Sequence, residues 1–186
     1  MSTTTWNGLT IPAAGTYTID VAHTRVGFTV KHMMVSKVRG DFTDFSGSVT
    51  VAENPLESTA ELTIKTESIN TQAPDRDGHL RSDDFLAAEK FPEITFRNGR
   101  VTGQSGDEFT VVGDLTIRET TKEVELKVEH GGVGTNPWGG VVWGFSITTE
   151  IDREDFGLTW NQALETGGVL VGKKIKIEIE GEANPA

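Results

Sequence analysis

Apolar and polar residues alternate with a period of two along most of this chain, the pattern of strands with one buried and one wet face. The clearest case runs from 122 to 130, where Val124, Leu126, Val128 and His130 share one face and charged residues occupy the other. The same alternation recurs over 25–32, 109–117, 141–151 and 169–180. Buried parallel strands would be apolar throughout. The pattern therefore predicts an antiparallel sheet of seven or eight strands.

Turn-forming residues separate these runs and set the expected ends of the strands. The predicted turns are Asn54-Pro55, Asn98-Gly99, Ser105-Gly106-Asp107, Asn136-Pro137 and Gly167-Gly168. We find no internal repeat or linker, and 186 residues suffice for one domain with a sizeable core. We expect loosely ordered tails at 1–14 and 182–186 around a single domain at 15–181.

One segment, from 75 to 90, breaks the alternation. Ser82 followed by Asp83 and Asp84 suits the start of a helix, because serine caps free N–H groups and carboxylates face the positive end of the helix dipole. Phe91-Pro92 would end it, since the residue before a proline avoids the helical conformation. We therefore predict a short helix that covers one end of the β-structure.

A sandwich and a barrel both produce this alternation. A barrel is favoured by a set of large aromatic residues with core-facing parity: Phe28, Phe45, Phe96, Phe109, Trp143 and Phe145. Strands of about ten residues, rising ~3.3 Å per residue and tilted ~40°, build a barrel roughly 25 Å tall. Such a barrel suits a long apolar ligand if it is hollow. Aromatic side chains also fill cores, so alternation alone leaves a filled interaction domain open.

Composition and charge exclude several classes of protein. The formal net charge is −11 and no cluster of Lys and Arg stands out, so we predict no binding to nucleic acid. The absence of Cys excludes a disulfide framework, a thiolate metal site and a Cys nucleophile. The N-terminal 15 residues lack the basic and apolar stretches of a secretory signal, which predicts a cytoplasmic protein. No apolar run approaches 18 residues, so we expect no stable membrane insertion.

Residues that could carry chemistry are few. No nucleophile elbow, phosphate-binding loop, zinc-protease motif or calcium loop occurs, which predicts a protein without catalytic residues. A metal site needs about three converging ligands, and no short spacing links the four histidines, His23, His32, His79 and His130. We therefore predict no metal site. Lys173 interrupts an inward row between Val171 and Ile175, and either extends to solvent at the strand end or meets the polar head of a ligand.

Several motifs follow one another in a characteristic order. The most specific runs over 76–86 (RDGHLRSDDFL) and leads into 91–96 (FPEITF). Others lie at 17–20 (YTID), 26–28 (VGF), 40–42 (GDF), 68–71 (SINT), 113–117 (GDLTI) and 151–158 (IDREDFGL). Together they resemble the YceI family of lipocalin-like proteins, and the resemblance extends from about Gly15 to Glu180.

The resemblance implies an all-β fold: an extended eight-stranded antiparallel barrel with a short helical insertion around residues 75–90. In this bacterial family the lumen binds a long-chain amphiphile, such as a polyisoprenoid, an isoprenoid quinone or a fatty acid derivative. It implies no catalytic residue and no cofactor besides such a lipid. The exposed strand edges of a barrel rim leave a homodimer open. Where the family often has Gly, Glu119 follows Arg118, which predicts an ordinary turn or mild strain.

We predict passive binding, because each buried methylene contributes about 0.8 kcal/mol. The apolar tail is expected to contact inward residues, namely Val26, Phe28, Val30, Phe45, Leu62, Ile64, Phe85, Phe96, Phe109, Val111, Leu126, Val128, Trp143, Phe145, Ile147 and Ile175. The groups expected near a polar head are His32, His79, Arg81 and Trp160. Two alternatives stay open. One is an enzyme that acts on the bound lipid through His79 with Asp83 or Asp84, and the other is a ligand-free interaction or stress-response domain.

Overall fold

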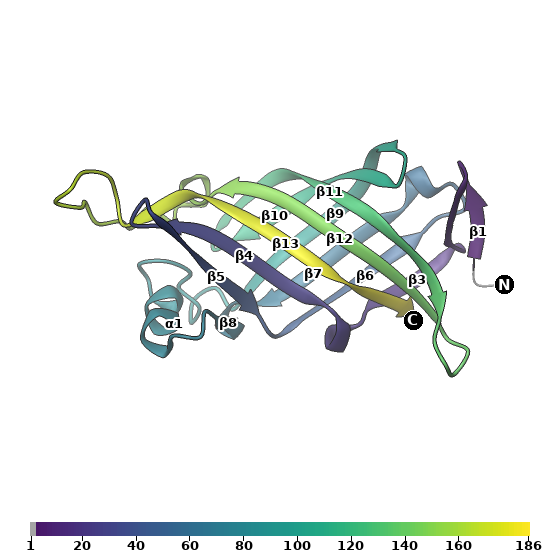
Figure 1. Ribbon diagram of the computed structural model, residues 1–186, viewed down its shortest axis with the longest axis horizontal. Helices are drawn as coiled ribbons and strands as arrows, with labels where there is room; N and C mark the ends of the chain where they lie inside the picture. The colour runs from purple at the N-terminus through teal and green to yellow at the C-terminus, as the bar shows by residue number, and fades with distance from the viewer. Residues whose placement is uncertain (1–2) are drawn as a thin grey trace.

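The computed structural model describes residues 3–186 (Figure 1), and within them the chain forms thirteen strands, one α-helix and four short 3-10 helices. The strands are β1 (Thr3–Trp6), β2 (Leu9–Pro12), β3 (Gly15–Ile19), β4 (Arg25–His32), β5 (Ser36–Phe42), β6 (Phe45–Val51), β7 (Thr59–Lys65), β8 (Ile69–Asn70), β9 (Glu93–Ser105), β10 (Glu108–Ile117), β11 (Thr120–Thr135), β12 (Val141–Asp152) and β13 (Val171–Pro185). The helices are α1 (Pro74–Arg81), η1 (Val21–His23), η2 (Pro55–Glu57), η3 (Thr66–Ser68) and η4 (Arg153–Phe156).

Eight antiparallel strands close into a barrel, as predicted. The ring runs β12, β11, β10, β9, β7, β6, β3 and β13, and it closes because β13 also pairs with β12. A second, smaller sheet is formed by the β1–β2 hairpin. Closure leaves the ring without free edges, so the long strands satisfy their backbone groups on both sides. Figure 1 shows the long strands running obliquely to the long axis of the molecule.

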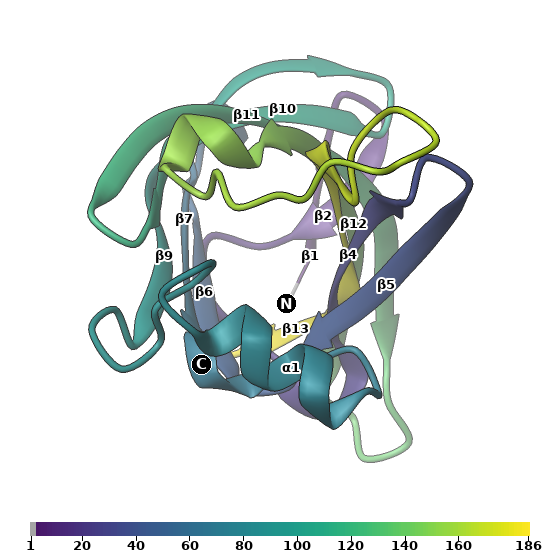
Figure 2. The same cartoon turned by 90° about the vertical axis from the view of Figure 1, so that its left-hand side faces the viewer.

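Strand β13 pairs with two different strands along one of its edges. Its C-terminal end pairs with β3, with Ala183 opposite Ile19, whereas its earlier part pairs with β4, with Ile179 opposite Val26. The 3-10 helix η1 separates β3 from β4 along the chain. The β4–β5 hairpin and β8 therefore extend the barrel wall at the end where α1 lies (Figure 2).

The structure confirms the inward parity predicted for the main strands. Along β10, residues Val111, Leu115 and Ile117 are buried and their neighbours are only partly so. Along β11, Val124 and Leu126 are partly buried, and the charged residues between and beside them are exposed. The apolar face of each ring strand thus turns toward a shared interior.

Asn98-Gly99 was expected to be a turn, and this prediction is wrong. The pair lies inside β9, where the pairing with β7 and with β10 shifts register, which is a β-bulge. Asn98 has a φ of 56°, and its Nδ2 donates to Asp114 Oδ2 at 2.9 Å. Asparagine tolerates this left-handed conformation in a bulge as well as in a turn, so local chemistry alone did not separate the two.

The helical insertion predicted around residues 75–90 is confirmed, but the residues expected to begin and end the helix were wrong. Helix α1 occupies 74–81, whereas Ser82, expected to begin a helix, caps its C-terminal end by donating its backbone N–H to the His79 carbonyl at 3.1 Å. Pro74 begins the helix, since proline has no N–H to lose and its fixed φ suits the first turn. Residues 83–90 form turns, and Ala87 has a φ of 47°, which no right-handed helix can contain.

The described residues of both tails lie mostly in strands, in contrast to our expectation of loose order. Residues 3–12 form the β1–β2 hairpin, while Met1 and Ser2 lie outside the described residues. The hairpin is held to the barrel, since Trp6 stacks on Phe109 with 6.1 Å between ring centroids and Ile11 is buried. At the other terminus β13 continues to Pro185 and pairs with β3. Both tails complete the barrel at the same end.

The two-residue β10–β11 turn carries its strain at Arg118 rather than at Glu119. Arg118 has a φ of 55°, a conformation that glycine adopts more easily. Its guanidinium donates from Nη1 to the Phe85 carbonyl at 3.2 Å and lies 5.8 Å above the Phe91 ring. These contacts fix the 82–91 segment against the barrel.

Replacing Gly113 with Ala is expected to destabilise the barrel. A Cβ there would lie 2.8 Å from Phe96 Cε2 and 2.9 Å from the Arg97 carbonyl oxygen, and one of these must move. Overpacking of this kind costs roughly 1–3 kcal/mol, measured as a lower urea midpoint. Gly103→Ala is the matched control, because a Cβ there meets nothing within 4 Å. Equal urea midpoints for the two variants would show that the position of the Phe96 ring does not require a glycine at residue 113.

Candidate functional site

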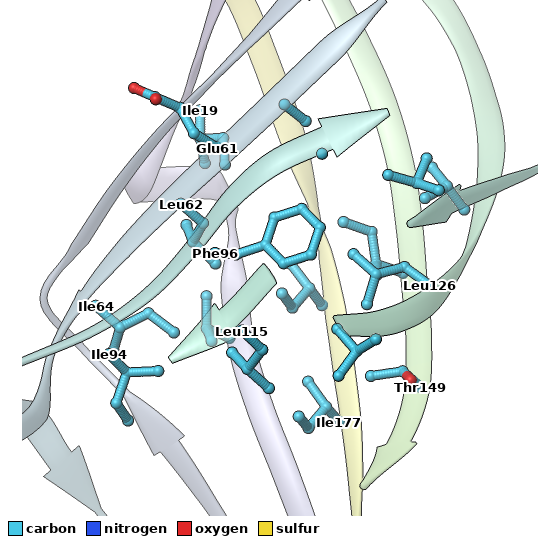
Figure 3. Close-up of a pocket in the computed structure, with 18 of the residues that line it drawn as sticks. Ile19, Glu61, Leu62, Ile64, Ile94, Phe96, Leu115, Leu126, Thr149 and Ile177 are labelled. Carbon is cyan, nitrogen blue, oxygen red and sulfur yellow. The ribbon is translucent and has the colours of Figure 1, made fainter. Parts of the chain in front are cut away.

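The barrel encloses a cavity of ≈ 320 Å³ lined by residues of the eight ring strands, β2, β4 and the α1 region. Its lining is overwhelmingly apolar. Figure 3 shows Leu62, Phe96, Leu115 and Leu126 directed toward this space, with the Glu61 carboxylate turned away from it. The Thr149 hydroxyl, a polar group on the lining, is bonded to the Glu125 carbonyl at 2.8 Å. The lumen therefore offers a long apolar ligand a dry surface.

Several inward residues remain only partly buried, which is unusual for apolar side chains that face the interior of a domain. Val128 on β11, Ile147 on β12 and Ile175 and Ile177 on β13 all line the cavity, and all are partly buried. Filled cores bury such residues completely, since protein interiors are close-packed. Partial burial here means that one side of each of these side chains borders the cavity, while Ile147, Ile175 and Ile177 also pack against the buried core.

The structure places fifteen of the sixteen residues predicted to contact an apolar tail on the cavity lining. They are Val26, Phe28, Val30, Leu62, Ile64, Phe85, Phe96, Phe109, Val111, Leu126, Val128, Trp143, Phe145, Ile147 and Ile175. The exception is Phe45, which is buried in the hydrophobic core but does not border the cavity. Strand parity correctly identified which residues point inward, but it could not separate a packed position from one that borders space.

None of the four residues expected near a polar head lines the cavity. Arg81 donates to the backbone carbonyls of Glu67 and Ile69 at 2.9 and 3.0 Å, so it anchors α1 to the segment before it. His32 is partly buried at the end of β4, where it pairs with Ser36 across the hairpin. These two predictions assigned ligand contact to residues that the structure uses in the frame of the barrel.

His79 and Trp160, the other two, meet in an aromatic cluster. The His79 ring lies 4.7 Å from Trp160 and 5.0 Å from Phe85, and Trp160 lies 5.3 Å from Phe85, between centroids. His79 Nε2 is also 2.8 Å from Asp84 Oδ2. Phe85 alone of the three lines the cavity. The cluster joins α1, the 82–90 segment and the 157–170 loop at one end of the lumen.

At the opposite end of the lumen, the polar groups of two ring side chains are hydrogen-bonded within the protein. Trp143 Nε1 donates to His130 Nδ1 at 3.0 Å, and His130 Nε2 lies 2.8 Å from the Thr10 carbonyl oxygen. Since a carbonyl can only accept, the His130 proton is on Nε2 in this arrangement. This bridge ties β2 to β11 and leaves no free hydrogen-bonding group on the two rings.

Arg153 is the site residue that sequence reasoning missed. It lines the cavity and is only 3% exposed, and burial lowers the pKa of its guanidinium. Its nitrogens donate to four backbone carbonyls, those of Leu158 (2.6 Å), Trp160 (2.9 Å), Gly172 (2.9 Å) and Val171 (3.3 Å). It therefore holds the 157–170 loop against the start of β13. Its place inside the 151–158 motif was the one sequence signal.

Lys173 takes the first of its two predicted roles and points to solvent. A register shift between Val171 and Ile175 interrupts the β13–β4 pairing at this point. The exposed Lys173 ammonium lies 3.1 Å from Glu154 Oε2. It therefore has no contact with the lumen.

Among residues 3–186, one group of three potential metal ligands comes together: Asp20, His23 and Glu182 lie with ligand atoms within 4.8 Å. Asp20 accepts from His23 Nδ1 at 2.9 Å and from Ala22 N at 3.0 Å, capping η1. The side-chain hydrogen bond raises the pKa of His23 and lowers that of Asp20. These bonds account for the geometry of the group, and we assign no metal to it.

Comparison with known proteins agrees with this architecture. A family profile described as "YceI-like domain" matches residues 17–183. The chain belongs to the YceI family. A curated relative, UPF0312 protein SA2479 of Staphylococcus aureus strain N315, is 45% identical over 168 residues, which cover 89% of this chain and 95% of that protein.

Solved structures of the YceI family and its fold resemble the barrel closely. The Campylobacter jejuni YCEI protein has a TM-score of 0.71 at 35% identity, covering 90% of this chain and 96% of that one. Burkholderia cenocepacia BcnA has a TM-score of 0.74 at 21% identity, with coverages of 90% and 99%. A polyisoprenoid binding domain from Saccharophagus degradans has a TM-score of 0.67 at 13% identity, with coverages of 93% and 99%. The last two likenesses show a shared fold.

The family match leaves out one element that borders the lumen. The YceI-like segment begins at residue 17, whereas the β1–β2 hairpin spans 3–12. Ile11 and Pro12 of this hairpin are buried and line the cavity. The family match thus covers most of the barrel, whereas one end of the lumen is completed by hairpin residues that lie outside the match.

Arg153→Met is expected to lower stability by roughly 2–3 kcal/mol, because it leaves several buried carbonyls without donors. The 157–170 loop should also be cleaved faster in limited proteolysis. Arg100→Met is the control, since Arg100 is exposed and paired with Glu123, and exposed pairs contribute little. Urea unfolding of both variants measures the difference. Equal losses would contradict an anchoring role for Arg153.

Proposed function

We propose that this YceI-family barrel binds a long-chain apolar amphiphile in its lumen, such as a polyisoprenoid, an isoprenoid quinone or a fatty acid derivative. The observation that carries the proposal is the apolar cavity, bordered by inward side chains that remain only partly buried. Its volume of ≈ 320 Å³ falls within the range of ligand pockets, about 300–1,000 Å³.

Binding in such a lumen would be driven by the hydrophobic effect. Each methylene moved from water into the apolar space contributes about 0.8 kcal/mol, so a tail of several isoprene or acyl units binds without polar contacts. Among the polar residues on the lining, Arg153, His130 and Thr149 already bond to backbone carbonyls. A polar head would therefore sit at an end of the lumen, where water can solvate it.

Two further findings support a binding protein. The shared fold includes a domain from Saccharophagus degradans described as polyisoprenoid binding, which is the class of ligand the cavity suits. Among the lining residues within 3–186, no hydroxyl is hydrogen-bonded to a histidine or a carboxylate side chain. Transport or storage of the lipid follows from reversible binding alone and requires no reaction.

Leu126→Trp is expected to reduce loading at least tenfold, because the larger ring fills the space that Leu126 borders. Phe145→Asp should abolish loading, since it places a carboxylate in the apolar lumen. Glu125→Gln, one residue away and on the exposed face of the same strand, should load like the wild type. Loading is measured by native mass spectrometry after incubation with a polyisoprenol or a long-chain fatty acid, with bound lipid identified by extraction.

The readout separates the proposal from a filled interaction domain. A mass increase that disappears on denaturation and is lost only in the two lumen variants supports lipid binding. Wild-type protein that stays bare with both lipid classes would overturn it, as would equal loading in Leu126→Trp and Glu125→Gln. Circular dichroism verifies that each variant is folded, and Leu126→Trp keeps the test valid if Phe145→Asp does not fold.

One observation favours a second candidate, an enzyme that acts on the bound lipid. His79 Nε2 and Asp84 Oδ2 are 2.8 Å apart at the end of the lumen, as in a base held by a carboxylate. Against it, neither residue lines the cavity. We expect wild type and His79→Ala to retain a loaded fatty acyl ester unchanged over hours, followed by mass spectrometry. Product formed by the wild type and lost in a loaded His79→Ala variant would establish the enzyme instead.

A further inference from the structure

The tip of the β4–β5 hairpin, Met33–Val35, exposes apolar side chains at the edge of the barrel. Met33, Met34 and Val35 are 45%, 57% and 86% exposed, in a protein whose other strands turn their apolar residues inward. A single exposed apolar residue is ordinary, but three adjacent ones on a hairpin tip form a projecting cluster. This segment, the hydrophobic tip, lies outside the buried core, although Met34 lies against Gly168 of the 157–170 loop.

Two residues of the tip have a left-handed backbone conformation that is unfavourable for methionine. Met33 and Met34 have φ values of 52° and 64°, and the turn closes with Val35 N donating to the His32 carbonyl at 3.2 Å. Two successive positive φ values favour Asn-Gly, which adopts them without steric cost. Methionine at both positions therefore costs stability relative to Asn-Gly.

Basic residues surround the tip, although the protein as a whole is acidic. Residues 31–39 (KHMMVSKVR) contain two lysines and one arginine and no carboxylate, within a chain of net charge −11. Lys31 and Lys37 face each other across the hairpin, and both are exposed. No ion pair within residues 3–186 engages either lysine. No cluster of Lys and Arg was identified from the sequence, whereas the pairing of β4 with β5 places Lys31 opposite Lys37.

The tip lies at the end of the barrel that is closed by loops. Met33 N donates to the Leu170 carbonyl at 2.8 Å, so the tip and the 157–170 loop lie side by side (Figures 1 and 2). Helix α1 borders the same end, and Leu80, Phe85 and Leu86 of this region line the cavity. At this end, non-strand segments held by side-chain contacts separate the cavity from solvent. A surface that binds the tip would thus face this end of the lumen.

We propose that the hydrophobic tip docks this barrel onto an anionic lipid bilayer, with Met33–Val35 in the headgroup region and Lys31 and Lys37 on lipid phosphates. This proposal rests on the proposed function, because a docked barrel could exchange the lipid in its lumen with the bilayer. Apolar side chains flanked by cations are what an anionic membrane surface attracts. A protein partner would need about 800 Å² of contact from this chain, more than three residues supply.

The overall negative charge does not oppose docking at physiological salt. Charges are screened beyond about 8 Å at 0.15 M ionic strength, so the lysines beside the tip dominate the local interaction. The described residues 3–186 contain no helix long and apolar enough to span a bilayer, and docking of this kind needs none. Three side chains in the headgroup region give reversible attachment.

The test uses sedimentation with vesicles of equal parts phosphatidylglycerol and phosphatidylcholine, and with phosphatidylcholine alone. Met33→Asn with Met34→Gly removes the apolar groups and supplies the residues that the turn prefers. This double variant should bind anionic vesicles at least tenfold more weakly than the wild type, with an unchanged or higher unfolding midpoint. The wild type should prefer anionic vesicles and lose binding as salt rises.

Two further variants identify what binds. Lys31→Gln and Lys37→Gln should each weaken binding about fivefold, the effect of one cation near an anionic membrane. Trp138→Ser is the control: Trp138 is 88% exposed on the β11–β12 hairpin at the opposite end, and residues 131–149 carry no charge. It should bind vesicles like the wild type.

Docking and lipid loading fail separately in this design. Loading is measured without vesicles, by mass spectrometry on lipid added from solvent, and the double tip variant should load normally. Leu126→Trp should dock on vesicles yet load poorly. Wild-type protein that ignores anionic vesicles, a double tip variant that binds them equally, or loss of binding in Trp138→Ser would each overturn the docking proposal and leave lipid loading untouched.

Discussion

Closure of the sheet at β13 is the constraint on which the rest of this protein depends. One edge of β13 pairs with β12, and the other is shared by β3 and β4. Because the ring is closed, every inward side chain of eight strands must face the same space, and strand tilt sets how wide that space is. The ring strands provide mostly branched apolar residues, which border the interior without filling it. An apolar lumen is thus a result of backbone pairing as much as of composition.

Two polar residues of the lumen lining, Arg153 and His130, and the buried Asp77 of α1 are hydrogen-bonded within the protein. Arg153 bonds to four carbonyls, and His130 bridges Trp143 and the Thr10 carbonyl. Asp77 accepts from Thr71 N at 2.8 Å and so holds α1 to the segment before it. An unpaired buried donor would cost free energy and would select a polar ligand. With these groups paired, the lining offers mainly apolar surface, the property on which the proposed lipid binding depends.

The two ends of the barrel are built differently, and this asymmetry gives the lumen a direction. At one end the β1–β2 hairpin is tied in by the Trp6–Phe109 stack and the His130 bridge. At the other end α1, the 82–90 segment and the 157–170 loop meet through the rings of His79, Phe85 and Trp160. The exposed Met33–Val35 tip stands at this second end. Exchange of a ligand with a surface would use the end held by side chains, because no strand pairing must break there.

The parity of Val124, Leu126 and Val128 was readable from the sequence because side chains in a strand alternate between its two faces, whatever surrounds it. The motifs of the YceI family likewise indicated an eight-stranded barrel with a helical insertion. Three local features were predicted wrongly because local sequence does not determine them. Asn98-Gly99 suits a turn and a bulge equally, Ser82 suits either end of a helix, and the tail at 3–12 owes its order to contacts with distant residues.

The sequence by itself determined which face of each strand is apolar, the antiparallel pairing and the family, since these depend on near neighbours and on ordered motifs. Only the tertiary structure decided that the interior is hollow, that Phe45 packs while Leu126 borders space, and that Arg153 anchors a loop. It alone brought Lys31 and Lys37 together beside an exposed tip. Apart from the Lys31–Lys37 pairing, which needs only the β4–β5 hairpin, these properties depend on distances between residues far apart in the chain, and those distances exist only once the ring has closed.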